Sequence, residues 1–212
     1  MNQAVEELFQ AVLTGNREQA VIKTRKALDQ GTEVSAVLKQ GLIAPMAEVG
    51  KLFEQNEYFV PEMLISARAM QAALEVLRPF LVDADVQPVG KMVVGTVAGD
   101  LHDIGKNLVA MMVEGAGFEI IDLGTDVTPE DFVKAVGESK ADLIGLSALL
   151  TTTMPMMKKT IDALAEAGLR EEVKVLIGGA PVTPDLAVEI GADGYAPDAG
   201  QAAKLAAQLI TA

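Results

Sequence analysis

The sequence predicts an N-terminal four-helix bundle over residues 1–85 and an α/β part over residues 90–212, built on a flavodoxin- or Rossmann-like, doubly wound, five-stranded parallel sheet. Apolar residues recur at helical spacing through residues 1–80, without the alternation typical of strands. Residues 81–90 bring two Asp, a Pro and a Gly, a composition typical of a linker. After this linker, short apolar runs alternate with helical stretches, which favours βαβ crossovers and a parallel sheet.

In the helical half, Val5, Leu8 and Val12 give the first helix its apolar stripe. Gly15-Asn16 is the expected break between the first and second helices, and Gln30-Gly31 is the expected break between the second and third. Thr32 is the expected N-cap of the third helix, and Pro45 an expected kink or boundary within its span of 33–54. The fourth helix is expected over 61–80.

In the second half, each expected strand is followed by a loop and a helix. The expected strands cover 91–96, 118–122, 142–146, 173–177 and 194–196. The expected helices cover 104–116, 129–139, 154–167, 183–190 and 200–210.

Composition excludes several classes of site. The chain of 212 residues has no Cys and one His, so disulfides, thiolate metal sites and two-histidine zinc sites are ruled out. A net charge of -13 disfavours nucleic acid and anionic membranes as partners. No apolar run is long enough to span a membrane, and the first ten residues are polar and acidic rather than a signal peptide. We expect a soluble, cytoplasmic protein.

The loop after the first expected strand holds the one His. It matches neither the Walker phosphate loop nor the dinucleotide-binding pattern of three glycines. Asp100 stands two residues before His102, where a carboxylate can hold one ring nitrogen while the other ligates a metal. Gly105 would let a bulky group approach the backbone. A lone His in a loop is also typical of a surface or capping residue.

Two more loops follow strands at the same expected sheet edge, where parallel sheets bind ligands. Residues 147–153 carry four hydroxyls, and capping of the next helix accounts for one of them. Gly178 and Gly179 suggest close approach by a flat or bulky ligand, although a tight turn would need glycine too. Three loops of this kind on one edge point to a large ligand.

Together these motifs resemble a known signature. Asp100-x-His102-x-x-Gly105, Ser147-x-Leu149 and Gly178-Gly179 are similar to the cobalamin-binding motifs of methionine synthase, methylmalonyl-CoA mutase and the corrinoid proteins of anaerobic methyltransferase systems. Residues 50–61 and 66–68 resemble the helical cap domain of methionine synthase. Length and two-part layout best match a free-standing corrinoid protein.

The resemblance implies a role for particular residues. His102 would be the lower axial ligand of cobalt, with Asp100 on the far side of its imidazole and Thr153 extending the relay, where methionine synthase has Ser. Ser147, Leu149 and Thr151 would line the pocket of the nucleotide tail, and the glycines would give it room. Phe53 and Val60 would cover the upper, methyl-bearing face, although both also fit ordinary core. The implied cofactor-binding residues are Asp100, Leu101, His102, Asp103, Ile104, Gly105, Ser147, Leu149, Thr151, Thr153, Gly178, Gly179, Ala199, Phe53 and Val60.

The resemblance also implies a carrier that is not catalytic alone. Its cofactor would be a corrinoid, cobalamin, whose cob(I)alamin form takes a methyl group from a donor-specific methyltransferase. The resulting methylcobalamin would pass that group to a second methyltransferase that uses tetrahydrofolate or a thiol, and a reductive activation protein would be a further partner. Methanol, methylamines, quaternary amines and aryl methyl ethers stay open as donors.

Three other functions are compatible with parts of the sequence. A B12-binding subunit of an adenosylcobalamin-dependent isomerase is disfavoured by the helical half, which resembles methionine synthase. A B12-binding sensor or regulator would need a basic DNA-binding segment, which is missing. A flavodoxin-like nucleotide domain would need a phosphate loop.

Overall fold

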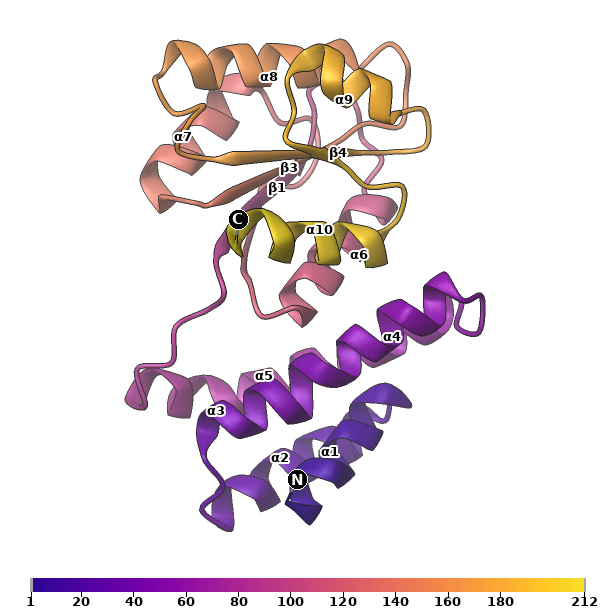
Figure 1. Ribbon diagram of the computed structural model, residues 1–212, viewed down its shortest axis with the longest axis vertical. Coiled ribbons are helices and arrows are strands. Elements are labelled where there is room, and N and C mark those ends of the chain that lie inside the picture. The colour runs from indigo at the N-terminus through magenta and orange to yellow at the C-terminus, as the bar shows by residue number, and fades with distance from the viewer. Residues whose placement is uncertain (1, 212) are drawn as a thin grey trace. The chain divides into compact units, whose positions relative to one another are not determined.

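The computed structural model describes residues 2–211, and the chain divides into two compact units with a boundary between Pro88 and Val89. The first unit is helical and the second is α/β (Figure 1). No helix within the described residues is both long and apolar enough to cross a lipid bilayer.

The helical unit follows the expected order of elements. Its helices are α1 (Gln3–Leu13), α2 (Arg17–Asp29), α3 (Val34–Ala36), the π-helix η1 (Val37–Ile43), α4 (Ala44–Glu54) and α5 (Val60–Asp83). The side chains of Asn2 and Asn16 cap α1 and α2 by accepting bonds from backbone N–H groups. The expected stripe of Val5, Leu8 and Val12 is buried.

The third helix differs from its prediction. Thr32 is not its cap, because Glu33 holds the N-cap position and the Thr32 hydroxyl accepts a bond from Asn2 instead. Helical backbone continues past Pro45, and the turns before it widen into η1, where the Ala44 N–H donates to Lys39 O. Proline has no N–H to donate and its ring crowds the preceding turn, which is the physical reason for this widening. The expected linker begins late, since α5 continues to Asp83.

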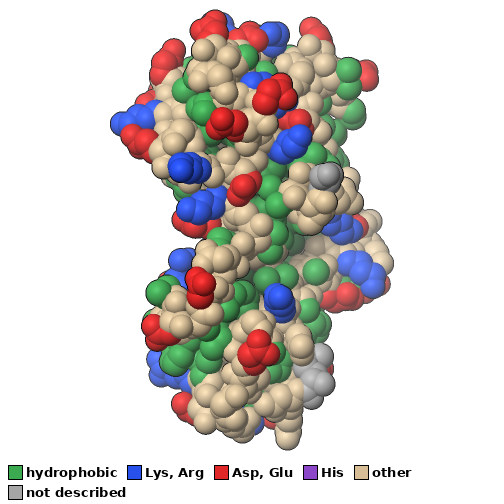
Figure 2. Space-filling model, turned by 60° about the vertical axis from the view of Figure 1, so that its left-hand side comes forward, with side chains coloured by type: hydrophobic (Ala, Val, Ile, Leu, Met, Phe, Trp, Pro, Cys, Tyr) green, Lys and Arg blue, Asp and Glu red, His purple; other side chains and the backbone are tan. Residues whose placement is uncertain are grey.

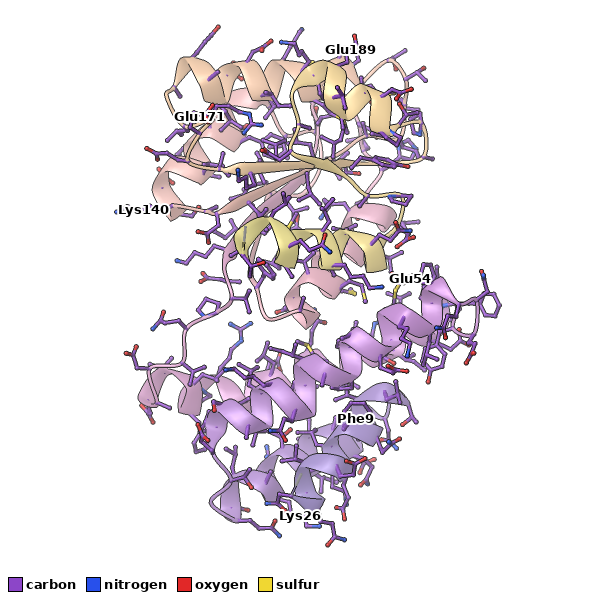
Figure 3. All side chains as sticks on the ribbon, viewed as in Figure 1. Phe9, Lys26, Glu54, Lys140, Glu171 and Glu189 are labelled. Atoms are coloured by element: carbon purple, nitrogen blue, oxygen red, sulfur yellow. The ribbon has the colours of Figure 1, made fainter. Side chains whose placement is uncertain are left out.

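Two ion pairs that share Glu7 join the first two helices. Glu7 of α1 lies 2.8 Å from the ammonium groups of both Lys23 and Lys26 of α2; Lys26 is labelled in Figure 3. Hydrogen bonds from Lys23 and then Lys26 lower the pKa of Glu7 from 4.5 to about 2. Glu7 is therefore ionised at all but strongly acidic pH.

The α/β unit is a five-stranded parallel sheet of order β2-β1-β3-β4-β5. Its strands are β1 (Lys91–Thr96), β2 (Glu119–Asp122), β3 (Leu143–Ser147), β4 (Lys174–Gly178) and β5 (Gly194–Tyr195). Its helices are α6 (Ile104–Gly115), α7 (Pro129–Ser139), α8 (Pro155–Glu166), α9 (Pro184–Ile190) and α10 (Ala199–Thr211). Helices α7, α8 and α9 cover one face of the sheet, and α6 and α10 the other (Figure 1).

The sheet core accounts for the short apolar runs in the sequence. Val93, Ile144 and Val175 join a buried cluster with Phe132 of α7 and Met157 of α8. Because both faces are covered, each strand reads as nearly continuous apolar sequence rather than as an alternating pattern. The strand order reverses between β1 and β3, which makes their carboxyl ends the expected position for a ligand.

Candidate functional site

The three motif loops leave the sheet side by side. Thr96 at the end of β1 pairs in register with Ser147 at the end of β3, and Ser147 pairs with Gly178 at the end of β4. The loops that begin after these residues therefore start at one level of one sheet edge. This edge carries the site predicted from the sequence.

Asp100 is the centre of the site. Its side chain is fully buried, yet both carboxylate oxygens are engaged. Oδ1 accepts the His102 backbone N–H at 3.1 Å and lies 2.7 Å from His102 Nδ1. Oδ2 accepts the N–H groups of Leu149 and Leu150 at 2.8 and 3.2 Å and the Thr153 hydroxyl at 2.8 Å.

These bonds decide the charge of Asp100. Burial raises the pKa of the carboxyl, but the hydrogen bonds from His102, Leu149 and Thr153 outweigh it and hold the pKa well below its usual range. An ionised carboxylate can only accept hydrogen bonds, so the facing Nδ1 of His102 must carry a proton. In the neutral imidazole the lone pair then lies on Nε2, which is the atom available to a metal.

The surroundings of His102 are open and apolar. The His102 side chain is 52% exposed. Leu101, just before it in the loop, and Ile104, the first residue of α6, are 72% and 76% exposed, which is unusual for large apolar residues in a well-packed unit. Leu149 and Leu150, whose amides bind Asp100, are each 41% exposed. A flat, largely apolar ligand would cover this surface.

The hydroxyls of residues 147–153, in the loop after β3, differ in burial and in hydrogen-bond partners. Thr153 is buried and donates to Asp100, as the relay predicts, and it also lies 2.9 Å from Leu150 O. None of the hydroxyls caps α8, whose N-cap residue is Met154 without a side-chain bond. Thr151 is exposed and Ser147 half-buried, so both are accessible at the sheet edge.

The glycines fall into two kinds. Gly105 is exposed, and a Cβ built on it would meet no atom within 4 Å, so this position is open to a ligand. A Cβ on Gly178 would lie 3.1 Å from Ala196 O, and one on Gly179 would overlap Ala148 O. Gly179 has φ +135° and lets the β4 loop lie directly on the β3 loop. The packing of the chain itself therefore requires glycine at 179 and leaves little room for a side chain at 178.

The other predicted residues lie apart from this network. Asp103 is exposed and accepts a bond from Asn107 at 3.0 Å, and Ala199 is buried at the start of α10. Phe53 lies half-buried in α4 and Val60 opens α5, so both belong to the helical unit. Their role over the upper face of a cofactor stays a prediction.

Sequence reasoning missed several residues that hold the loop of His102. Thr96 donates its hydroxyl to His102 O at 2.9 Å, and Asp126 accepts the Gly99 N–H at 2.6 Å. Lys106 is almost fully buried and binds both oxygens of Asp122. The available signals were a threonine at a strand end and a lysine at the start of a helix, and neither is specific.

The described residues contain no cluster of three His, Cys, Asp or Glu side chains suited to holding a metal ion. The donor set is instead one imidazole with an ionised carboxylate behind it and apolar side chains around it. This set suits a metal that brings most of its ligands with it, as cobalt does in a corrin ring. The residues present therefore fit a corrinoid.

Comparisons with known proteins agree with this fit. Two family models, each described as a B12 binding domain, match residues 90–204 and 4–78. Dimethylamine corrinoid protein 1 of Methanosarcina acetivorans is 44% identical over 207 residues, which cover 97% of both chains.

Two crystal structures resemble the chain over most of its length. A cobalamin-binding protein of Desulfitobacterium hafniense DCB-2 is 32% identical, with a TM-score of 0.80 over 97% of this chain and 98% of that one. A chain of the methanol:cobalamin methyltransferase complex of Methanosarcina barkeri is 28% identical, with a TM-score of 0.88 over 99% of this chain and 80% of that one. With its matched domains, its relatives and its His102 loop in agreement, the chain belongs to the cobalamin-binding corrinoid proteins of methyltransferase systems.

Proposed function

We propose that this protein is a methyl carrier that holds a corrinoid through His102 and moves a methyl group between two methyltransferases. The observation that carries the proposal is the contact of 2.7 Å between His102 Nδ1 and the buried carboxylate of Asp100. This contact leaves the lone pair on Nε2 of a half-exposed imidazole, with exposed apolar side chains beside it in the sequence. The cytoplasmic location expected from the sequence stays a prediction.

The residues proposed to hold the corrinoid act in three ways. His102 Nε2 would ligate cobalt, with Asp100 and Thr153 setting the basicity of the imidazole. Leu101 and Ile104 would contact the lower face of the ring. Ser147, Leu149 and Thr151 would line the nucleotide tail, together with Asp103, Gly105, Gly178, Gly179 and Ala199 as the remaining proposed contacts.

When bound, the corrinoid supplies the metal centre that receives and releases the methyl group. The chain would bind the corrinoid and hold the proton on Nδ1 of His102. Nδ1 keeps its proton and donates it in a hydrogen bond to the ionised Asp100, which would hold the lone pair on Nε2 and raise the basicity of the imidazole as a ligand. Phe53 and Val60 of the proposed cap domain, 1–85, would limit access to the opposite face of the cofactor at rest.

A donor-specific methyltransferase would supply the methyl group, and a second one would consume it with tetrahydrofolate or a thiol as acceptor. The names of the relatives make dimethylamine the first donor to test. In the view of Figure 2, acidic side chains are mixed with Lys and Arg on both units. The net charge of -13 still favours partners with basic rims, so transfer rates should fall as salt rises.

The first experiment tests the ligand. His102 is the one histidine of the chain, so ¹⁵N-histidine labels a single residue. Electron paramagnetic resonance of the Co(II) form should show ¹⁵N coupling in place of ¹⁴N coupling, and His102→Ala should lose it while keeping some corrinoid through the tail pocket. Coupling from the cofactor's own base, or an unchanged spectrum in His102→Ala, would contradict the proposal.

The second experiment tests the carrier role. The cobalamin-loaded protein, reduced to its Co(I) state, is mixed with dimethylamine, with and without a dimethylamine-specific methyltransferase, and the cobalt absorption spectrum is followed. Methylation should require the partner, and demethylation a second methyltransferase. Rapid methylation of the purified chain alone would mean that it is an enzyme rather than a carrier.

A further inference from the structure

We propose that Asp126 and Thr96 are positioning residues that hold the His102 loop in its ligating geometry before a corrinoid arrives. The inference rests on the proposed role of His102. It concerns two side chains outside the motif Asp100-x-His102-x-x-Gly105. Neither residue contacts the imidazole itself, so each acts through the backbone of the loop.

The loop needs such support because it has no regular structure of its own. Residues 98–103 lie between the end of the β1 region and the first turn of α6. Gly99 has φ +81°, which reverses the chain just before Asp100. The five donors to the Asp100 carboxylate include the His102 N–H, and the Asp100 N–H donates to Val97 O at 3.1 Å. The Gly99 N–H and the carbonyl groups of Asp100 and His102 depend on other residues for their partners. A loop free to shift by an ångström would misplace Nε2.

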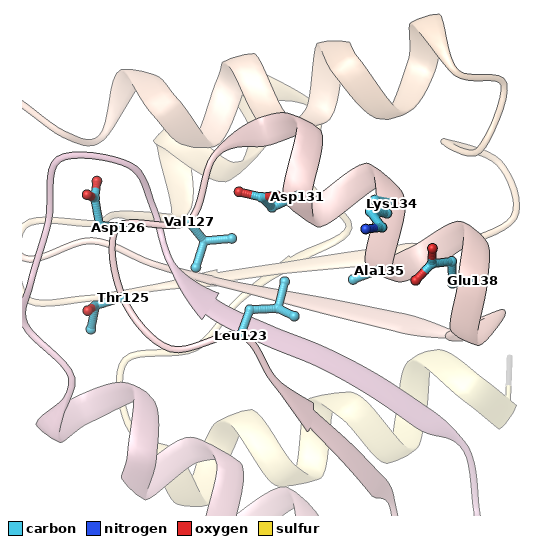
Figure 4. A pocket seen from close by; sticks show the side chains of 8 residues that line it. All are labelled: Leu123, Thr125, Asp126, Val127, Asp131, Lys134, Ala135 and Glu138. Atoms are coloured by element: carbon cyan, nitrogen blue, oxygen red, sulfur yellow. The ribbon is translucent and has the colours of Figure 1, made fainter.

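Asp126 holds the start of the loop with two bonds. Its Oδ1 accepts the Gly99 N–H at 2.6 Å, and its backbone N–H donates to Asp100 O at 3.0 Å. The two bonds clasp consecutive residues, which fixes the peptide between them. Asp126 itself has φ +56°, a conformation that Asp and Asn tolerate better than most residues. It belongs to the loop between β2 and α7, beside an open pocket also bordered by Thr125 and Asp131 (Figure 4).

Thr96 holds the far side of the loop. Its side chain is fully buried at the end of β1, and its hydroxyl donates to the carbonyl oxygen of His102 at 2.9 Å. This carbonyl belongs to the peptide group that follows His102, so the bond restrains the backbone that carries the imidazole. Removing the hydroxyl would leave the carbonyl without this donor.

Together the two residues fix the loop on both sides of His102. A loop ordered in advance binds a ligand more tightly, because binding no longer has to order it. The expected consequence is a loss of corrinoid affinity and of cobalt–histidine coupling when either clasp is removed, while the sheet remains folded.

The experiment uses paired variants of the full chain. Asp126→Gly removes the carboxylate without straining the positive φ, and Asp126→Asn keeps an acceptor. Thr96→Val removes the hydroxyl at nearly constant shape, and Thr96→Ser keeps it. Matched controls are Asp131→Ala, a carboxylate lost nearby, and Thr160→Val, a buried hydroxyl that donates to Met156 O at 2.9 Å in α8.

Two readouts separate positioning from general stability. Without cofactor, the Gly99 amide should exchange its hydrogen about tenfold faster in Asp126→Gly, the effect of losing one bond to a charged acceptor. With cobalamin, Asp126→Gly and Thr96→Val should bind about tenfold more weakly and show less ¹⁵N-histidine coupling. Asp126→Asn and Thr96→Ser should recover most of both, and the controls should match the unsubstituted chain.

The outcomes distinguish the two proposals. Unchanged Gly99 exchange in Asp126→Gly, or unchanged affinity and coupling in both Asp126→Gly and Thr96→Val, would overturn the positioning role. Absence of histidine coupling in the unsubstituted protein would instead overturn the ligand role of His102, and the exchange of Gly99 would still decide whether Asp126 holds the loop. If Thr96→Val does not fold, Asp126→Gly carries the test.

Discussion

Gly179→Ala is expected to destabilise the α/β unit strongly. A Cβ at this position would overlap the carbonyl oxygen of Ala148, a backbone atom that can move only if the main chain shifts. The φ of +135° also belongs to a region that residues other than glycine rarely adopt. We expect a cost of about 1–3 kcal/mol for the backbone conformation and about 1–3 kcal/mol for the overlap, or about 2–6 kcal/mol in all.

Two other glycines serve as controls. Gly191 has φ +76° with nothing within 4 Å of a Cβ, so Gly191→Ala should cost only the left-handed conformation, about 1–2 kcal/mol. Gly178 has no positive φ and a contact of 3.1 Å to Ala196 O, so Gly178→Ala should cost less than Gly179→Ala. Comparing the losses in free energy of unfolding among the three variants separates the cost of the contact between the β3 and β4 loops from the cost of the positive φ.

The assay exploits the two tyrosines of the chain, one in each unit. In a Tyr58→Phe background, Tyr195 of β5 reports unfolding of the α/β unit in urea. Gly179→Ala should shift the midpoint strongly downwards. If it costs no more than Gly191→Ala yet abolishes corrinoid binding, the glycine serves the ligand and our reasoning from chain packing is refuted.

Three further predictions concern separate parts of the molecule. Gly105→Ala should stabilise the cofactor-free protein by about 0.5–1 kcal/mol, since it removes a helical glycine, yet weaken cobalamin binding; equal affinity would place Gly105 away from the ligand. The Glu7 ion pair stabilises the helical unit above pH 4.5, and this contribution disappears as pH falls towards 2. Glu7→Gln should therefore reduce the fall in the free energy of unfolding of the helical unit between pH 4.5 and pH 2. Unfolding is followed by Tyr58 fluorescence in a Tyr195→Phe background. An equally steep fall in the Glu7→Gln variant would contradict the lowered pKa of Glu7. Phe53→Ala should speed photolysis of the methylcobalamin-loaded protein without unfolding it, and an unchanged rate would leave Phe53 as core.

The sequence predicted the sheet well because each strand has a local signal. The runs at 91–96 and 173–177 are apolar and bounded by Gly, Pro or charged residues, and the observed strands differ from them by one residue at most. Helix α7, with Thr128 as its N-cap and Pro129 in its first turn, matches its predicted span. The motif spacing likewise indicated Asp100 as the partner of His102, and the resemblance to the cobalamin-binding family implied Thr153, whose bond to Asp100 the structure contains.

What the sequence could not predict depends on contacts between distant residues. Thr32 looked like a cap, but Asn2 engages its hydroxyl from thirty positions away. Asp126 bonds the Gly99 N–H from a backbone conformation with positive φ, and no local sequence pattern predicts either the conformation or the bond. The glycine pair after β4 could serve either a ligand or a neighbouring loop, and only the position of Ala148 decides between them.

The network around Asp100 also bears on the order of folding. Its carboxylate meets Leu149 and Thr153 across 49 and 53 positions of sequence, so it cannot form until β3 has docked beside β1. Contacts this distant pay a large loop-closure entropy and form late in folding. A partly folded chain with its helices and the β1–β2 pair in place would still lack the donors of residues 149–153 that anchor the Asp100 carboxylate behind His102. Acquisition of cobalamin during refolding should therefore follow the docking of β3 beside β1.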